Sequence, residues 1–140
     1  MINPLPTRTE LEAFLATEFP QSDFLIEALE PEQVTLRKPV GFADLRPGGT
    51  VSGPTMMALA DCALYVAILA RIGIVPLAVT TSLSFNFMRR PLPEADLLAT
   101  CNLLKLGRSL AVGEVHLYSA GDERAVAHAV GTYSIPPPRD

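Results

Sequence analysis

Hydrophobic residues change their spacing along this chain, from a helical spacing near the start to an alternating one in the second half. Between residues 7 and 19 the apolar positions recur every three or four residues, which predicts a helix. A Thr-x-x-Glu pattern opens this helix, counted from Thr7 or from Thr9. Residues 24–30 and 33–39 alternate instead, and we predict two short strands joined by a turn.

The middle of the chain contains a long apolar helix. Residues 40–51 are rich in glycine and proline and are predicted to form a loop. The helix begins at Gly53-Pro54, where proline suits a first turn, and ends at Gly73. It is long enough to cross a membrane. However, it begins with Gly-Pro and contains the carboxylate of Asp61, so we predict the buried helix of a soluble domain and no membrane partner.

Strands connected by short turns follow this helix. From residue 77 to residue 87 the apolar positions alternate with period two, and Thr80 falls on the face opposite to Leu83. Further strands are predicted at residues 95–106, 109–119 and 124–134. Short turns require antiparallel pairing. The last strand has small residues on one face, which would let a helix approach closely: Ala125, Ala127, Ala129 and Gly131.

These elements predict a single α+β domain over residues 1–140, with an antiparallel sheet wrapped around the long central helix. The chain has 140 residues, of which 49% are hydrophobic, so it can fold as one domain and is not disordered. Its net charge is −4 and it has no basic run, which argues against nucleic acid as a partner. The first ten residues lack the pattern of a signal peptide, and the two cysteines form no disulfide or zinc pattern. We therefore expect a reducing, cytoplasmic location.

Asp61 is the main candidate for chemistry, because it is the single charge between residues 51 and 70. Burying an unpaired carboxylate costs several kcal/mol, so its position needs a reason. One reason is structural: a hydrogen bond or an ion pair, within the chain or across a subunit contact. The other is catalytic: a general base or a nucleophile in a site that excludes water.

The start of the central helix is the second candidate site. Its free N–H groups can polarise a carbonyl, and because Pro54 has none, Gly53 and Thr55 are the candidate donors. Ser52 is an N-cap candidate. Eight residues separate Gly53 from Asp61, about 12 Å along a helix, so one helix cannot place both on the same carbonyl. Two subunits arranged antiparallel could place Gly53 of one and Asp61 of the other on the same carbonyl. A catalytic Asp61 would then require at least a dimer.

The remaining reactive side chains give weaker signals. His116 and His128 lie in the middle of predicted strands, and the spacing supplies no third partner for a metal or for acid–base chemistry, so we expect no metal site. Cys62 and Cys101 resemble small buried residues, and Asp61 would raise the pKa of the neighbouring Cys62 thiol.

Several segments together resemble hotdog-fold acyl-CoA thioesterases of the phenylacetate-pathway (PaaI-like) type. The resemblance covers residues 34–134 and rests on the order and spacing of GPTMMALAD, VTTSLSFNFMRRP, the segment at 96–99, the turn Gly107-Arg108-Ser109, and VAHAVGTY. It implies hydrolysis of an acyl-CoA thioester by a homodimer or a tetramer, with no cofactor, because coenzyme A is part of the substrate. In that family the acid on the central helix activates water or attacks the thioester, and an amide at the helix start from the other subunit polarises the carbonyl.

The resemblance assigns roles to individual residues of this chain. Asp61 and Gly53 match the two catalytic positions, and Thr80 falls where the family places a hydroxyl near the attacking water, although it is also explained as a polar residue on the second face of a strand. The implied substrate-binding residues lie at the helix start, at strand ends and in the following turn: Ser52, Thr55, Arg89, Arg90, Lys105, Arg108 and Ser109. The basic residues among them would meet the phosphates of coenzyme A, or would be solvated strand ends.

The chain also departs from that family at the helix start. Ser52-Gly53-Pro54 replaces the usual His-Gly-Gly, and Arg46 occupies the position of a common Asn. These departures keep a second hypothesis open, an acyl-CoA-binding hotdog protein without efficient catalysis. A third, a hotdog dehydratase or hydratase, fits less well because no histidine precedes His116.

Overall fold

The computed structural model describes residues 4–137. Its elements follow the predicted order of helix, strand pair, long helix and strands, with one short 3-10 helix, η1 (Phe42–Asp44). The other elements are α1 (Arg8–Glu18), β1 (Leu25–Leu29), β2 (Val34–Lys38), β3 (Leu45–Arg46), β4 (Thr50–Val51), α2 (Gly53–Ile72), β5 (Val79–Phe87), β6 (Leu97–Leu106), β7 (Leu110–Ser119) and β8 (Ala127–Ser134).

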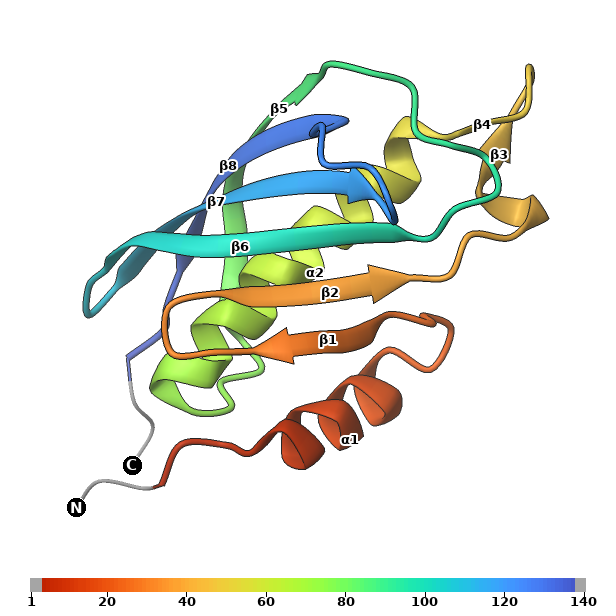
Figure 1. Ribbon diagram of the computed structural model, residues 1–140. Helices are drawn as coiled ribbons and strands as arrows, with labels where there is room; N and C mark the ends of the chain where they lie inside the picture. The colour runs from red at the N-terminus through yellow and green to blue at the C-terminus, as the bar shows by residue number, and fades with distance from the viewer. Residues whose placement is uncertain (1–3, 138–140) are drawn as a thin grey trace.

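Six strands form one sheet in the order β1-β2-β6-β7-β8-β5, and every neighbouring pair is antiparallel. The sheet curves around α2, which crosses it on one face, while α1 lies beside β1 (Figure 1). The remaining strands, β3 and β4, form a separate small hairpin. The predicted α+β class, an antiparallel sheet wrapped around a long central helix, is confirmed.

Helix α2 forms the centre of the hydrophobic core. It has the length and hydropathy of a membrane-crossing helix, but ten of its residues are buried within this fold. Leu64 packs so closely against the sheet that a Cβ atom at Gly113 or Gly131 would collide with its side chain. The small-residue face predicted for the last strand therefore does what the sequence indicates: it lets the helix approach.

Local hydrogen bonds fix the ends of the helices. At α1 the capping box is the one counted from Thr7, since Thr7 and Glu10 bond to each other's backbone N–H groups. At α2 the Ser52 side chain accepts from the Thr55 N–H, so Ser52 is the N-cap, and Gly73 ends the helix with a φ of 97°.

Two predicted boundaries are wrong for local reasons. The predicted loop at 40–51 contains the β3–β4 hairpin, which turns through Gly48 and Gly49 at φ values of 96° and 76°. The last strand begins at Ala127 instead of residue 124, because the Asp122 carboxylate accepts from the backbone N–H and guanidinium of Arg124 and holds a turn there.

Candidate active site

Asp61 lies in the third turn of α2 and faces two hydroxyl groups from the sheet. The Thr80 hydroxyl donates to Asp61 Oδ1 at 2.6 Å, and the Tyr133 hydroxyl is 2.8 Å from the same oxygen and 2.9 Å from the Asp61 carbonyl oxygen. Three elements, α2, β5 and β8, thus meet at one carboxylate oxygen. The carboxylate is oriented, and its position is set by tertiary packing.

A β-bulge in β5 brings Thr80 to this carboxylate. Thr80 pairs with Tyr133 and Ser82 pairs with Thr132, which leaves Thr81 as the extra residue. The strict alternation predicted for residues 77–87 is therefore wrong at this point. The bulge puts Thr80 on the same face of the sheet as Leu83 and as Tyr133, toward α2, instead of on the opposite face.

Tyr133 is a site residue to which the sequence analysis assigned no role. It is buried, its ring packs against Tyr65 at a centroid distance of 6.1 Å, and burial is the main reason that the pKa of its hydroxyl is raised above the ordinary value. The hydroxyl is thus a neutral donor at neutral pH. The signal was available, because Tyr133 continues the inward-facing series of Ala129 and Gly131, and a buried tyrosine hydroxyl needs a polar partner.

The second carboxylate oxygen of Asp61 is open. Among residues 4–137, none donates a hydrogen bond to Asp61 Oδ2, and no Lys, Arg or His forms an ion pair with Asp61. Asp61, Thr80 and Tyr133 line a pocket of about 1160 Å³. A carboxylate that is held by hydroxyls and has one oxygen open toward a pocket can accept a proton from water or attack an electrophile.

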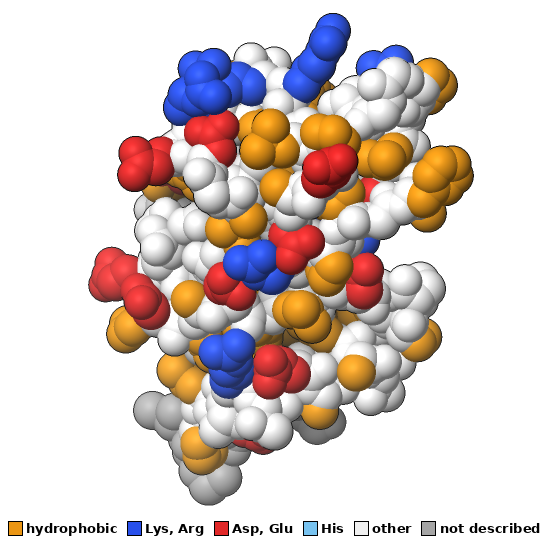
Figure 2. All heavy atoms as spheres, turned by 45° about the vertical axis from the view of Figure 1, so that its right-hand side comes forward, with side chains coloured by type: hydrophobic (Ala, Val, Ile, Leu, Met, Phe, Trp, Pro, Cys, Tyr) orange, Lys and Arg blue, Asp and Glu red, His pale blue; other side chains and the backbone are white. Residues whose placement is uncertain are grey.

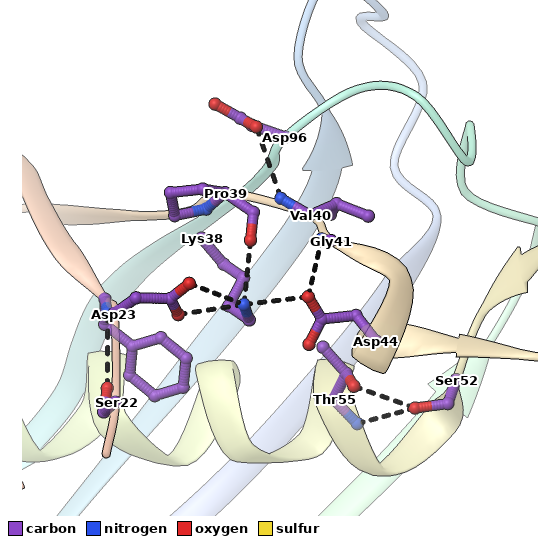
Figure 3. Close-up of polar contacts among 11 residues, drawn as sticks. Ser22, Asp23, Lys38, Pro39, Val40, Gly41, Asp44, Ser52, Thr55 and Asp96 are labelled. Carbon is purple, nitrogen blue, oxygen red and sulfur yellow. Dashed lines mark hydrogen bonds and ion pairs between the residues drawn. The ribbon is translucent and has the colours of Figure 1, made fainter.

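A buried lysine lies on another wall of the same pocket. Lys38 Nζ lies 2.9 Å from carboxylate oxygens of both Asp23 and Asp44 and donates to the Pro39 carbonyl at 2.8 Å (Figure 3). Burial by itself would raise the pKa of Asp44, but the Gly41 N–H and Lys38 hold this pKa below its ordinary value. This cluster ties the end of β2 to η1 and forms part of the pocket wall.

Cys62 lines this pocket beside Asp61, but it is a poor nucleophile. Burial, and secondarily the Asp61 charge, raises the pKa of its thiol to about 12. Cys101 is buried, and its thiol pKa is also raised to about 12. Both thiols therefore remain protonated at neutral pH, in agreement with the direction predicted for Cys62.

The start of α2 has fewer free donors than the sequence indicates. The Thr55 N–H is bonded to the Ser52 side chain at 3.3 Å, and the two hydroxyls lie 2.8 Å apart (Figure 3). Pro54 has no N–H. Among residues 4–137 none accepts from the Gly53 N–H, so Gly53 is the remaining donor of the two candidates. Thr55 itself lines the pocket of Asp61.

Gly53 opens onto a second, smaller pocket of about 460 Å³, which contains basic residues. Arg46, Arg89 and Arg90 line it together with Phe87. Figure 2 shows Lys and Arg side chains gathered at the upper end of the molecule, where Figure 1 shows the β5–β6 connection and the β3–β4 hairpin. The arginine that replaces the family's asparagine therefore lies with the two arginines predicted to bind substrate.

The other predicted substrate-binding residues lie elsewhere. Lys105 is near the end of β6, and Arg108 and Ser109 follow in the turn to β7. Arg89 and Arg90 precede the start of β6, so the ten-residue strand separates the two groups by about 30 Å within one chain. Among residues 4–137, one group of side chains has the spacing of metal ligands, and it contains neither Asp61 nor any of the predicted substrate-binding residues.

Comparisons with known proteins identify the class. The sequence profile of the thioesterase superfamily matches residues 48–126, so the chain belongs to this superfamily. A comparison with curated protein sequences gave no match.

Solved structures agree with this assignment. A protein from a Silicibacter species, described as a candidate thioesterase, is 48% identical over 97% of this chain and 96% of its own, with a TM-score of 0.88. A mutant of the phenylacetic acid degradation protein PaaI from Thermus thermophilus is 25% identical, and the match covers 89% of this chain and 99% of that protein, with a TM-score of 0.72. Zebra fish thioesterase superfamily member 2 has the same fold, with a TM-score of 0.82 and 21% identity. The match covers 94% of this chain and 99% of that protein. The chain is thus a PaaI-like thioester hydrolase with the hotdog fold.

Proposed function

We propose that this protein hydrolyses acyl-CoA thioesters as a homodimer, with Asp61 of one subunit and the Gly53 N–H of the other acting on the same carbonyl. The observation that carries the proposal is the Asp61 carboxylate itself. Hydroxyls bind one of its oxygens, no cation neutralises it among residues 4–137, and its other oxygen is open toward a pocket. A purely structural carboxylate in the wall of this pocket would be expected to have a cation beside it, as Asp44 has in Lys38.

The proposed reaction needs two groups that act on opposite sides of the thioester carbonyl. Asp61 either takes a proton from a water that attacks the carbonyl carbon, or attacks that carbon itself and forms an anhydride that water then hydrolyses. In both cases the C–S bond breaks and coenzyme A leaves as a thiolate, which takes up the proton held by Asp61 in the first route and a proton from water in the second. The Gly53 N–H of the partner subunit stabilises the negative charge that develops on the carbonyl oxygen.

Strand β5 supports an arrangement in which two subunits share the site. It is the edge of the six-stranded sheet, and Val79, Phe87 and Met88 at or beside its ends are each about half exposed. A long edge strand with exposed apolar side chains at its ends is a template for pairing with another chain. Antiparallel pairing of β5 with its own copy would cover these residues and join the two sheets.

The same pairing would bring the two halves of the site together. Asp61 bonds to Thr80 near the start of β5, whereas Gly53 lies beside its end, where a Cβ at Gly53 would be 3.3 Å from the Phe87 ring. In an antiparallel β5–β5 pair, the end of one strand lies opposite the start of the other. Gly53 of one subunit would then approach Asp61 of the other, whereas within one helix the two are about 12 Å apart.

The basic pocket beside Gly53 suits the coenzyme A part of the substrate. Arg46, Arg89 and Arg90 would meet its phosphates, since guanidinium groups bind phosphate through paired hydrogen bonds. The larger pocket, which is lined in part by Phe19, Phe24 and Tyr65, would hold the acyl group.

The test is release of free thiol from acetyl-, hexanoyl-, palmitoyl-, phenylacetyl- and 4-hydroxybenzoyl-CoA by the wild-type protein and by the Asp61→Ala variant. We expect turnover of at least one substrate, and its loss in the variant with the fold retained. Label found in the Asp61 carboxylate after a single turnover in ¹⁸O-labelled water would establish the anhydride route, because only an anhydride attacked at the Asp61 carbonyl transfers label there. Size measurement by light scattering tests the dimer.

The second candidate function, acyl-CoA binding without efficient hydrolysis, is favoured by the helix start. Pro54 and the Ser52 cap leave one of the usual first-turn donors, at Gly53. No thiol release from any of these substrates, with acyl-CoA still raising the melting temperature, would establish this function instead.

A further inference from the structure

The two histidines lie together on the face of the sheet that points away from α2. Along β7 the residues alternate, with Val115 and Leu117 buried against the core and Glu114 and His116 half-buried on the other face. On β8 the half-buried series includes His128, which pairs directly with His116 in the register of the two strands. Pairing between strands therefore brings the two histidines together.

Glu114, two residues before His116 on the same face of β7, supplies a third partner that the sequence analysis did not identify. Its carboxylate oxygen Oε2 lies 3.0 Å from His128 Nε2, and the rings of His116 and His128 have a centroid distance of 4.7 Å. One ligand atom from each of the three residues can be chosen so that all lie within 4.8 Å of one another. In a tetrahedral zinc site, bonds of about 2.0–2.1 Å place the ligand atoms roughly 3.3 Å apart.

We propose that Glu114, His116 and His128 form a binding site for one divalent transition-metal ion of the zinc class. Two imidazole nitrogens and one carboxylate oxygen are ligands that Zn²⁺ accepts, and water would complete the coordination. The Glu114–His128 pair already has a ligand-like separation, and rotation of the His116 side chain would close the third distance. The ligands stand on two paired strands, so the ion would join β7 to β8.

The surroundings favour a cation at this position. The neighbouring strands β5 and β6 place only uncharged side chains next to the three residues. In the strand register Asn86 pairs with His128, Thr100 with His116, and Asn102 with Glu114. The neighbouring ring is that of Tyr118, with its centroid 6.5 Å from that of His116. No lysine or arginine at these positions competes for the Glu114 carboxylate. This site is independent of the proposed thioester hydrolysis, because Asp61 lies on the opposite face of the sheet.

The test is calorimetric titration of ZnCl₂ into the metal-stripped full-length protein. We expect one Zn²⁺ per chain, no binding at this site in His116→Gln or His128→Gln, and affinity reduced roughly tenfold or more in Glu114→Gln. Glu123→Gln removes an exposed carboxylate from the β7–β8 turn and is the matched control, which we expect to bind as the wild type does. Circular dichroism establishes that each variant is folded.

A second readout identifies the ligands. Cu²⁺ at this site is expected to show electron paramagnetic resonance couplings to two imidazole nitrogens, and to one in each histidine variant. Zn²⁺ is also expected to raise the melting temperature of the wild type and of Glu123→Gln, but not that of the histidine variants. The proposal is overturned if the wild type takes up no Zn²⁺, or if the stoichiometry and the nitrogen couplings are the same in the histidine variants.

Discussion

Three aspartates line the same pocket, and two of them, Asp44 and Asp61, have different partners. Asp44 Oδ2 accepts hydrogen bonds from the Gly41 N–H at 2.8 Å and from Lys38 Nζ at 2.9 Å, so a cation neutralises it. Asp61 Oδ1 has only the hydroxyls of Thr80 and Tyr133 as side-chain partners among residues 4–137. Both carboxylates are held in place and each has one oxygen without a hydrogen-bond partner among residues 4–137, but of the two only Asp61 keeps an uncompensated charge.

These contacts suit a structural role for Asp44 and the proposed reactive role for Asp61. A neighbouring cation stabilises the charged form of Asp44 and lowers its basicity, which suits a permanent contact. Hydroxyl groups orient Asp61 without cancelling its charge, so it can still receive a proton or attack a carbon. Each prediction below tests whether the two aspartates differ in this way.

The largest expected effect is on turnover. Asp61→Asn keeps the size of the side chain and removes its basicity, so we expect kcat to fall by roughly 10²–10⁴. The matched control, Asp44→Asn, is expected to keep kcat within a few-fold of wild type. The measurement is thiol release from the best acyl-CoA substrate. Equal losses in the two variants would show that the aspartates do not differ in role.

The two hydroxyl donors are positioning residues with a smaller effect. Tyr133→Phe and Thr80→Val each remove one hydrogen bond to a charged group, worth about 1.5 kcal/mol or more, so we expect kcat to fall roughly tenfold. KM should change little, because neither hydroxyl is proposed to bind substrate. Steady-state kinetics separate the two constants, and Thr80→Ser, which restores a hydroxyl, should recover most of the activity. A change in KM alone would assign these groups to substrate binding.

Lys38 should affect stability instead of catalysis. Lys38→Met leaves the half-buried Asp44 without its cation, and we expect the free energy of unfolding to fall by about 2 kcal/mol. Urea denaturation measures this loss, while kcat per folded molecule should stay near the wild-type value. Arg124→Met, which removes an exposed ion pair with Asp122, is the control and should leave stability nearly unchanged.

The pH dependence of stability should follow Asp44. Its pKa in the folded protein is below the ordinary value of 3.8, so the unfolded chain binds a proton first as the pH falls. The carboxylate therefore contributes stability above about pH 4 and loses this contribution below it. We expect Asp44→Asn to lose less stability than wild type between about pH 5 and pH 3 in urea denaturation. An identical loss would mean that other carboxyl groups dominate.

The smallest predicted effect concerns Cys62. With a thiol pKa of about 12, it should react slowly with a disulfide reagent at about pH 8 and rapidly once urea unfolds the chain. Asp61→Asn removes the Asp61 charge, the lesser of the two causes that raise the Cys62 pKa, so Cys62 should react modestly faster in this variant. Rapid reaction in the folded wild type would contradict the raised pKa of this thiol.

Much of the fold follows from local sequence patterns. The Gly-Pro start and Gly73 predict the bounds of α2 closely, because proline and glycine act on the backbone directly. Alternation predicts most strands to within a few residues, and the short turns require their antiparallel pairing. Asp61 is apparent from the sequence as the single charge on an apolar helix. A structural and a catalytic role remain equal interpretations at that level.

The tertiary structure decided which groups surround that charge. Tyr133 lies 72 positions from Asp61 in the chain, and Thr80 reaches it only because of a bulge that breaks the predicted alternation. Tertiary structure also brings Arg46 into one pocket with Arg89, and Glu114 next to His128. The sequence by itself determined the elements, the core helix and its one carboxylate. Strand register and helix–sheet packing, which depend on contacts between distant residues, decided what that carboxylate and the two histidines touch.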